Sequence, residues 1–354
     1  MKNLYKNLAK GEEIFVGIDL HKKTWHVTIR SADVELFNSS IPGSWDALKH
    51  QLMKFKGHPI HAVYEAGYFG FWLHDHLIDF GADCLVTPPS LIPLEYGNKV
   101  KTDRRDSSKL AFLLAKGMLK RVHVPTQEER YHRQAIRRRR QLVNDRVRAQ
   151  SRIKAELQLY GIDLPHPTGK WTQVYFENLS RIRFKNHWMQ QSFNRLLEQY
   201  RFLDNQIGQQ TKLIRELSED PLYKDKVKIL CTIPGVGILV AMELLLELQD
   251  VTRFQKADQL AAYVGLTPSQ YSSADKIRMG RITCIGKKVL RSMLVQASWQ
   301  LIRKDGVMRE KYQKIKARGG GKRAIIAIAR TLVIRMRRLL LDGVPYVSGV
   351  ISSS

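Results

Sequence analysis

The sequence has few cysteines and no long apolar run. Cys84, Cys231 and Cys284 are far apart and lack the spacing of metal ligands, so they predict buried thiols in a reducing cytoplasm. No apolar stretch is long enough to cross a bilayer, which argues against a membrane protein. Residues 1–12 are polar and lack the apolar core of a signal peptide. We therefore expect a cytoplasmic protein that has no membrane partner.

Acidic residues are also scarce. Asp and Glu number 33 against 59 for Lys and Arg, which gives a net charge of +26 over 354 residues. An excess this large predicts a polyanionic partner, nucleic acid ahead of an anionic membrane surface. The length predicts two or three domains with a sizeable core.

Residues 13–21 form a short apolar run with Asp19 set into its end. Val, Ile and Phe favour a strand, and the nearly continuous apolar run predicts a strand covered on both faces. A carboxylate there is costly unless a cation or hydrogen bonds hold it. Residues 24–30 and 33–39 alternate like half-buried antiparallel strands. Such an arrangement resembles the beginning of ribonuclease-H-like nucleases; the plain alternative is a turn or capping Asp.

The next segments complete a sheet. Residues 44–55 predict a helix, 59–65 a strand that ends on Glu65, 69–80 a helix and 83–87 a short strand. The order β-β-β-α-β-α-β predicts one mixed α/β sheet with helices on its faces.

Two further carboxylates, Asp103 and Asp106, lie three residues apart where residues 101–109 run into an apolar helix. Helix N-termini favour carboxylates, so either Asp has a plain interpretation as a cap or first-turn charge. Together with Asp19 and Glu65, however, the pair has the chemistry to hold divalent cations such as Mg²⁺ at a phosphodiester. The spacing alone leaves both interpretations open.

Residues 127–160 predict a long basic helix. Ten Lys or Arg fall between Arg130 and Lys154, against the single acid Asp145. A charge run is usually a solvated face, but this one recurs beside an apolar seam, which predicts phosphate contacts. Residues 186–217 resume a helix whose apolar spacing predicts an antiparallel hairpin or a dimer contact.

The C-terminal third is mainly helical. Residues 233–237 (Ile-Pro-Gly-Val-Gly) separate two apolar helices; this is either a tight turn or a helix-hairpin-helix motif whose glycine amides meet a DNA phosphate. Residues 265–273 predict a loop with three serines near basic side chains. Physical chemistry alone does not choose a nucleophile among Ser269, Ser272 and Ser273. Residues 319–322 predict a hinge.

Several blocks resemble a known family. Val16-Gly17-Ile18-Asp19, Tyr64-Glu65-Ala66-Gly67 and Lys101-Thr102-Asp103-Arg104-Arg105-Asp106 resemble the catalytic blocks of the DEDD transposases of the insertion-sequence one-ten family. Residues 233–237 and 265–291 resemble that family's C-terminal transposase domain. The matching blocks cover nearly the whole chain in the expected order.

The resemblance implies an RNase-H-like (RuvC-like) α/β domain at residues 1–125, a basic coiled-coil linker at 126–222 and a mainly α transposase domain with a helix-hairpin-helix at 223–354. It implies a metal site of Asp19, Glu65, Asp103 and Asp106 that binds Mg²⁺ or Mn²⁺. In the family pattern the serine nucleophile falls on Ser273. The family commonly has Gly next, where this chain has Ala274-Asp275, so Ser272 remains an alternative.

The resemblance also implies an RNA-guided DNA transposase or recombinase of the bacterial nucleoid that binds element ends, target DNA and a bridge RNA. It implies a homo-oligomer, from dimer to tetramer, with the metal site and the serine acting together. The nucleic-acid-binding residues that we predict are Arg137, Arg138, Arg139, Arg140, Arg146, Arg148, Gly235, Gly237, Lys276, Arg278 and Arg281. The alternatives are a metal-dependent nuclease or Holliday-junction resolvase without a serine nucleophile, and a non-catalytic nucleic-acid-binding protein.

Overall fold

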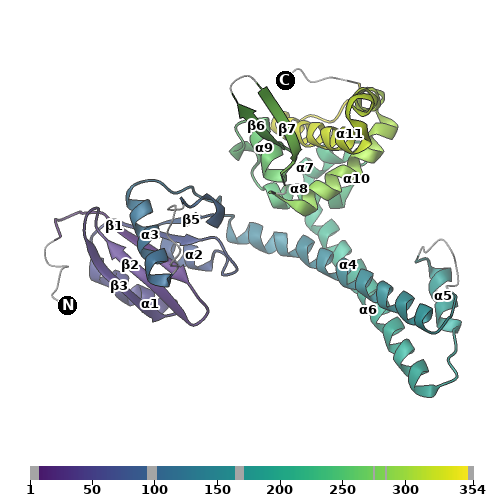
Figure 1. Ribbon diagram of the computed structural model, residues 1–354, viewed down its shortest axis with the longest axis horizontal. Coiled ribbons are helices and arrows are strands. Elements are labelled where there is room, and N and C mark those ends of the chain that lie inside the picture. The colour runs from purple at the N-terminus through teal and green to yellow at the C-terminus, as the bar shows by residue number, and fades with distance from the viewer. Residues whose placement is uncertain (1–7, 94–101, 164–170, 274–275, 284, 350–354) are drawn as a thin grey trace. The chain divides into compact units, whose positions relative to one another are not determined.

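The computed structural model describes residues 8–93, 102–163, 171–273, 276–283 and 285–349, without the side chains of residues 271–279. The chain divides into two compact units, residues 1–125 and 126–354. The first unit carries the mixed sheet and the second carries most of the helices (Figure 1). Each unit is described by itself.

The first unit is built on a five-stranded sheet in the order β3-β2-β1-β4-β5. The strands are β1 (Ile14–Leu20), β2 (Thr24–Arg30), β3 (Glu35–Pro42), β4 (Ile60–Glu65) and β5 (Asp83–Thr87). The first three strands pair antiparallel, and β1–β4 and β4–β5 pair parallel. The predicted mixed α/β sheet is therefore confirmed, with the Asp-bearing strand at its centre.

Helices cover both faces of this sheet. Alternate residues of β1, Ile14, Val16 and Ile18, pack with the buried leucines of α1 (Trp45–Leu52) and α2 (Trp72–Asp79). The intervening positions face α3 (Asp103–Ala115), which packs on β1, β2 and β4. This arrangement explains why β1 is nearly continuously apolar, as expected for a strand covered on both faces.

Helix α3 approaches β1 closely at Gly17. A Cβ built on Gly17 would lie 2.1 Å from the carbonyl oxygen of Ser107 and 2.5 Å from the amide nitrogen of Ala111. The buried hydroxyls of Thr28 and Ser107 also lie within hydrogen-bonding distance, 2.8 Å apart. Glycine is required here because only hydrogen fits between strand and helix. The contact fixes the start of α3 beside the end of β1.

The helix predicted over residues 69–80 begins later, at Trp72. Gly70 has φ +66°, a left-handed conformation that interrupts a right-handed helix, and its carbonyl accepts a hydrogen bond from the Tyr64 hydroxyl. The helix predicted over residues 44–55 is α1 followed by the 3-10 turn η2 (Met53–Phe55). A second 3-10 turn, η3 (Pro89–Leu91), follows β5.

Two long helices open the second unit. Helix α4 (Gln127–Leu159) and helix α6 (His187–Ser218) pack antiparallel, because the N-terminal Ile136 clusters with Ile214 and the C-terminal Leu157 clusters with Phe193. The predicted antiparallel hairpin is thus the arrangement found within the chain. A capping box between Thr126 and Glu129 starts α4.

Helix α5 (Gln173–Arg181), which lies between the two long helices, was not predicted from the sequence. Its buried Tyr175, Phe176 and Leu179 have helical spacing and pack with α4 and α6. The break predicted at residues 165–169 lies outside the described residues.

The remaining helices surround the largest apolar core. They are α7 (Lys224–Cys231), α8 (Ile238–Leu248), the 3-10 turn η4 (Val251–Arg253), α9 (Ala257–Val264), α10 (Lys288–Lys304) and α11 (Gly306–Asp342). Gly320 interrupts α11 with φ +78° and ψ 163°, which confirms the predicted break within residues 319–322. None of the helices in the described part of the chain is long and apolar enough to cross a membrane.

The predicted serine loop is wrong in its secondary structure. Residues 268–273 form strand β6 (Pro268–Ser273), which pairs antiparallel with β7 (Lys276–Ile282). The polar residues resemble a turn in sequence, but the hairpin partner supplies their backbone with hydrogen bonds. Cys84 is buried and Cys231 is half-buried, and both are free thiols; Cys284 lies outside the described residues.

Candidate active site

Asp19 and Asp103 come from two elements that the fold places side by side. Asp19 lies near the end of β1, two residues after Gly17, and therefore on the face of the sheet that α3 covers. Asp103 is the first residue of α3, after Thr102, whose hydroxyl caps the helix by accepting the Arg105 amide. The strand end and the helix start thus bring two carboxylates together.

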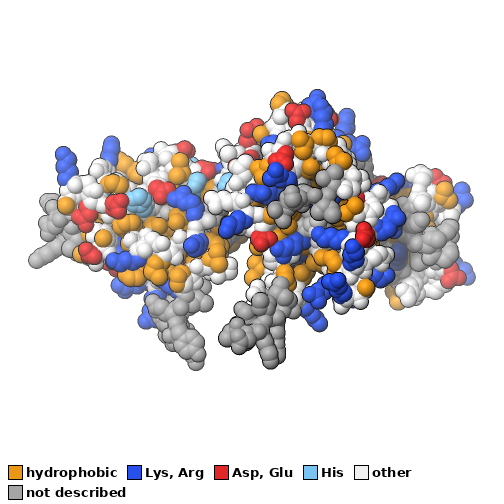
Figure 2. All heavy atoms as spheres, turned by 90° about the horizontal axis from the view of Figure 1, so that it is seen from above, with side chains coloured by type: hydrophobic (Ala, Val, Ile, Leu, Met, Phe, Trp, Pro, Cys, Tyr) orange, Lys and Arg blue, Asp and Glu red, His pale blue; other side chains and the backbone are white. Residues whose placement is uncertain are grey.

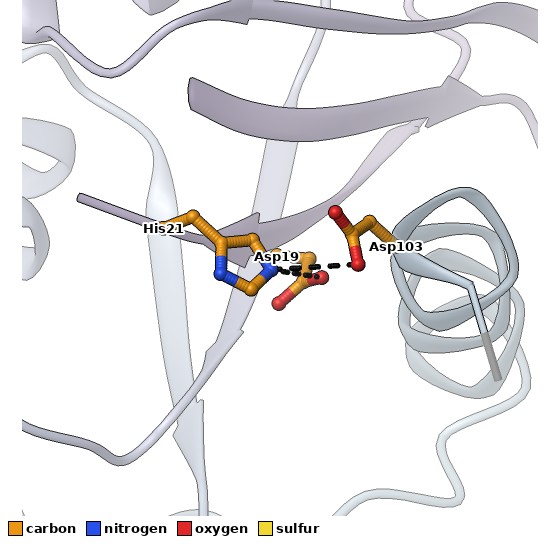
Figure 3. Close-up of side chains that lie close together, drawn as sticks. All are labelled: Asp19, His21 and Asp103. Carbon is orange, nitrogen blue, oxygen red and sulfur yellow. Dashed lines mark hydrogen bonds and ion pairs between the residues drawn. The ribbon is translucent and has the colours of Figure 1, made fainter. Parts of the chain in front are cut away.

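His21 contacts both of these carboxylates through one ring nitrogen (Figure 3). Its Nε2 atom is 3.2 Å from Asp19 Oδ2 and 3.5 Å from Asp103 Oδ1. One donor atom from each of the three residues lies within 4.8 Å of the other two. The side chain of Asp19 is 21% exposed, whereas those of His21 and Asp103 are 51% and 62% exposed. The cluster is therefore half-buried at Asp19 and open to solvent at His21 and Asp103.

The surroundings of Asp19 disfavour a bare negative charge. Burial raises the pKa of Asp19 above its usual value, the nearby His21 opposes this increase, and the charges of Asp103 and Asp106 raise the pKa further. Carboxylates that destabilise one another in this way favour a bound cation, which relieves their repulsion. The donor set of carboxylate oxygens with one imidazole nitrogen therefore fits a divalent metal ion.

Glu65 and Asp106, the other two predicted ligands, lie next to this cluster in the fold. Glu65 is exposed at the end of β4, and the parallel register that pairs Ile18 with Tyr64 makes it level with Asp19. Asp106 is half-buried in the first turn of α3, and its charge acts on Asp19. Neither belongs to the group of donors within 4.8 Å of one another.

His21 was not among the site residues predicted from the sequence. The residue follows Asp19 by two positions, so the signal available was an Asp-x-His spacing at the end of the predicted central strand. That spacing alone did not distinguish a ligand from an exposed turn residue.

The predicted nucleophile lies at the end of a strand. In the hairpin, Ser273 is the last residue of β6 and pairs with Lys276, while Ser272 pairs with Ile277 and Tyr271 with Arg278. The Ser269 hydroxyl donates to the Arg281 carbonyl at 3.2 Å, so Ser269 has a structural role. The register therefore places Ser273 at the turn of the hairpin, with basic residues on the opposite strand.

Comparisons with known proteins agree with these features. The family model "Transposase IS116/IS110/IS902 family" matches residues 227–313, and the DEDD transposase model of the IS110 family matches residues 16–162. The transposase for insertion sequence element IS1533 of Leptospira borgpetersenii is 31% identical over 251 residues, which cover 69% of this chain and 72% of that protein.

The chain belongs to the IS110 family of transposases.

Two further relatives extend the comparison of this transposase. The putative transposase y4qE of Sinorhizobium fredii is 26% identical over 343 residues, which cover 94% of the chain and 83% of the relative. The pilin gene-inverting protein of Moraxella bovis is 37% identical over 93 residues, which cover 26% of the chain and 27% of the relative. The family establishes the transposase as an enzyme of DNA recombination, and the DEDD-type domain supports dependence on a divalent metal.

The transposase does not use its run of four arginines uniformly. Arg137 donates to the buried Glu247 of α8 at 3.0 Å, and Arg140 donates to the buried Glu243 at 2.8 Å. Lys287, at the start of α10, also contacts Glu247 at 3.1 Å. Burial alone would raise the pKa of Glu247, but Lys287 and Arg137 outweigh it and the pKa is lowered. These contacts hold α4 against the helical core.

The other predicted phosphate-binding arginines differ in their partners. Arg139 donates to the hydroxyl of Thr211 at 2.8 Å, and Arg146 pairs with Asp204. Thr211 and Asp204 both belong to α6. Arg138 and Arg148 are exposed and contact residues of their own helix, Gln141 and Asp145 respectively. Arg137, Arg139, Arg140 and Arg146 thus have partners on other helices, and phosphate contact stays a prediction for all six arginines.

The glycine turn of the transposase also has two different glycines. Gly235 has φ +89°, and a Cβ there would lie 2.6 Å from the Ala297 carbonyl of α10, so packing against α10 requires glycine. Gly237 is the N-cap of α8, and a Cβ there would meet nothing within 4 Å. Packing therefore requires glycine at 235 but not at 237, and phosphate binding by the turn stays a prediction. Arg281 is exposed; the side chains of Lys276 and Arg278 lie outside the described residues.

Proposed function

We propose that this transposase cuts DNA by attack of Ser273 on the scissile phosphate and rejoins it by the reverse reaction, and that a divalent metal, Mg²⁺ or Mn²⁺, held at the cluster of Asp19, His21 and Asp103 assists both steps. The convergence of the three donor atoms within 4.8 Å supports the metal site. When bound, a divalent cation supplies positive charge that polarises the scissile phosphate. Asp19 and Asp103 hold that charge in place from the rigid β1 and α3, while Glu65 and Asp106 add negative charge at its edge.

In this proposal the Ser273 hydroxyl attacks the phosphorus atom. An Oγ–P bond forms, the bond from phosphorus to one sugar oxygen breaks, and the Oγ proton passes to solvent or a base while the leaving oxygen takes up a proton. The reverse attack by a sugar hydroxyl restores a phosphodiester and frees the serine. Because the phosphoserine link conserves the ester, strands are rejoined without an outside source of energy.

Metal removal tests the proposed site. Dialysis against EDTA should abolish strand cleavage, and Mn²⁺ or Mg²⁺ should restore it, because the clustered carboxylates need a cation to bind a phosphate anion. DNA cleavage on labelled element ends measures the activity. Ca²⁺ addition after EDTA controls for simple neutralisation of charge. Full cleavage in EDTA would show that the cluster is not a metal-dependent site.

We further propose that the exposed face of α4 binds the phosphates of a guide RNA. Arg138, Arg148 and Arg152 are exposed and, at 100° per residue, fall within about 80° of one another around the helix. Lys and Arg side chains also outnumber acidic ones on the face of the molecule seen in Figure 2. An exposed row of guanidiniums on a rigid helix contacts a phosphate backbone without reading its bases.

Replacing Arg138, Arg148 and Arg152 together by Gln should weaken RNA binding and flatten its salt dependence. Loss of three phosphate contacts should reduce the slope of log affinity against log salt by about two to three. Filter binding with the element's noncoding RNA over a salt series measures this slope. The matched control is Arg195→Gln, an exposed arginine of α6 paired with Glu198. An unchanged slope in the triple variant would place the RNA elsewhere.

A further inference from the structure

The carboxylate cluster contains a side chain that the pattern of four acids does not include. His21 directly follows β1, which ends at Leu20, and its Nε2 atom contacts both Asp19 and Asp103. Building on the proposed metal site, we infer that His21 is a metal ligand and that its imidazole biases the site toward a transition-metal ion such as Mn²⁺ over Mg²⁺.

The geometry supports a ligand because one nitrogen atom is directed at both carboxylates. A surface histidine in an ordinary ion pair needs only one acid, whereas His21 Nε2 lies 3.2 Å from one carboxylate of the sheet and 3.5 Å from another at the start of a helix. Two of the donor atoms come from the end of β1 and one from the start of α3, and all three lie within 4.8 Å of one another (Figure 3). A cation among them would receive two oxygens and one nitrogen.

The donor set predicts metal preference. Mg²⁺ takes oxygen ligands almost exclusively and retains several waters, whereas first-row transition metals bind imidazole nitrogen readily. Replacing one oxygen by a neutral nitrogen therefore weakens a site for Mg²⁺ more than for Mn²⁺. A site made of four carboxylates alone has only oxygen ligands and would lack this preference for Mn²⁺.

A second histidine of the same sheet provides a matched control. His26 of β2 pairs with Asp19 in the strand register, so it lies on the neighbouring strand at the same level. Its Nδ1 is 3.0 Å from the Ser40 hydroxyl and its Nε2 is 2.8 Å from Asn38 Oδ1. Because both of its ring nitrogens are engaged within the sheet, His26 should not bind the ion.

Pulsed electron paramagnetic resonance of Mn²⁺ bound to the full-length protein tests the inference directly. The wild-type spectrum should show coupling to an imidazole nitrogen, which changes its frequency when histidine is labelled with ¹⁵N. The coupling should vanish in His21→Ala and persist in His26→Ala. Calorimetric titration should show that His21→Ala weakens Mn²⁺ binding by at least about tenfold, the size seen when groups supporting a metal site are lost, with a smaller loss for Mg²⁺.

Two results would overturn the inference: bound Mn²⁺ without nitrogen coupling in the wild-type protein, or the same coupling in folded His21→Ala. If circular dichroism shows that His21→Ala does not fold, two other measurements test the inference. They are the ¹⁵N comparison in the wild-type protein and the loss of nitrogen coupling in His21→Gln. Failure of the proposed function has a different signature, namely no bound Mn²⁺ signal together with cleavage that persists in EDTA.

Discussion

Replacement of Asp103 by Asn should lower the rate of DNA strand cleavage by at least about a thousandfold, or about 4 kcal/mol of transition-state stabilisation. The substitution keeps the size of the side chain but removes the negative charge that faces His21 and Asp19. A neutral amide holds a divalent cation far less well than a carboxylate. Single-turnover cleavage of a labelled element end measures the rate.

Asp46→Asn is the matched control for this substitution, because Asp46 also lies exposed in the first turn of a helix, α1. It should leave cleavage unchanged. DNA and RNA binding by the Asp103 variant should stay close to that of the wild type, since the charge lost is negative and 62% exposed. Cleavage at the wild-type rate in Asp103→Asn would remove Asp103 from the chemistry.

The second large effect is expected at the hairpin. Ser273→Ala should abolish the covalent protein–DNA link and reduce strand transfer by roughly ten-thousandfold or more, as when other catalytic nucleophiles are removed. Denaturing gels of protein incubated with labelled DNA detect the link, and mass spectrometry of the digested adduct identifies the phosphorylated residue. Binding of DNA should persist because a single hydroxyl is lost.

Ser272→Ala is the control, since the register places Ser272 opposite Ile277, one position before the end of β6. It should retain the adduct. An adduct that is lost in Ser272→Ala and kept in Ser273→Ala would move the nucleophile to Ser272. Metal-dependent cleavage by the wild type with no adduct at all would instead indicate a nuclease that uses only the acids.

The parts of the fold that were predicted from sequence depend on local patterns. The apolar run before Asp19 specifies a central strand because its burial on both faces is visible in the residues themselves. The position of Asp103 follows from a helix start, which Thr102 and the acidic first turn indicate locally. Such features depend on neighbours in the chain, so they can be predicted without knowledge of the tertiary structure.

Two of the parts that were missed depend on distant partners. The contact between His21 and Asp103 appears only when α3 is placed beside β1, because Asp103 lies more than eighty positions later in the chain than His21. Likewise, four consecutive arginines look alike in sequence, but Arg137 and Arg140 meet Glu247 and Glu243 more than a hundred residues away. The β6–β7 hairpin was missed for a different reason: its partners are close in the chain, but its polar, serine-rich residues lack the alternating apolar pattern that indicates a strand.

The shared contact at Glu247 limits how the enzyme can be re-engineered. One buried carboxylate holds both Arg137 of the basic helix and Lys287, which lies five residues beyond the end of the serine-bearing hairpin. A chimaera that exchanges α4 for the helix of a relative, in order to change nucleic-acid recognition, would have to carry arginine at positions 137 and 140. Without them, a graft intended to change only recognition would take Arg140 away from the buried Glu243 and leave the buried Glu247 with Lys287 but without Arg137.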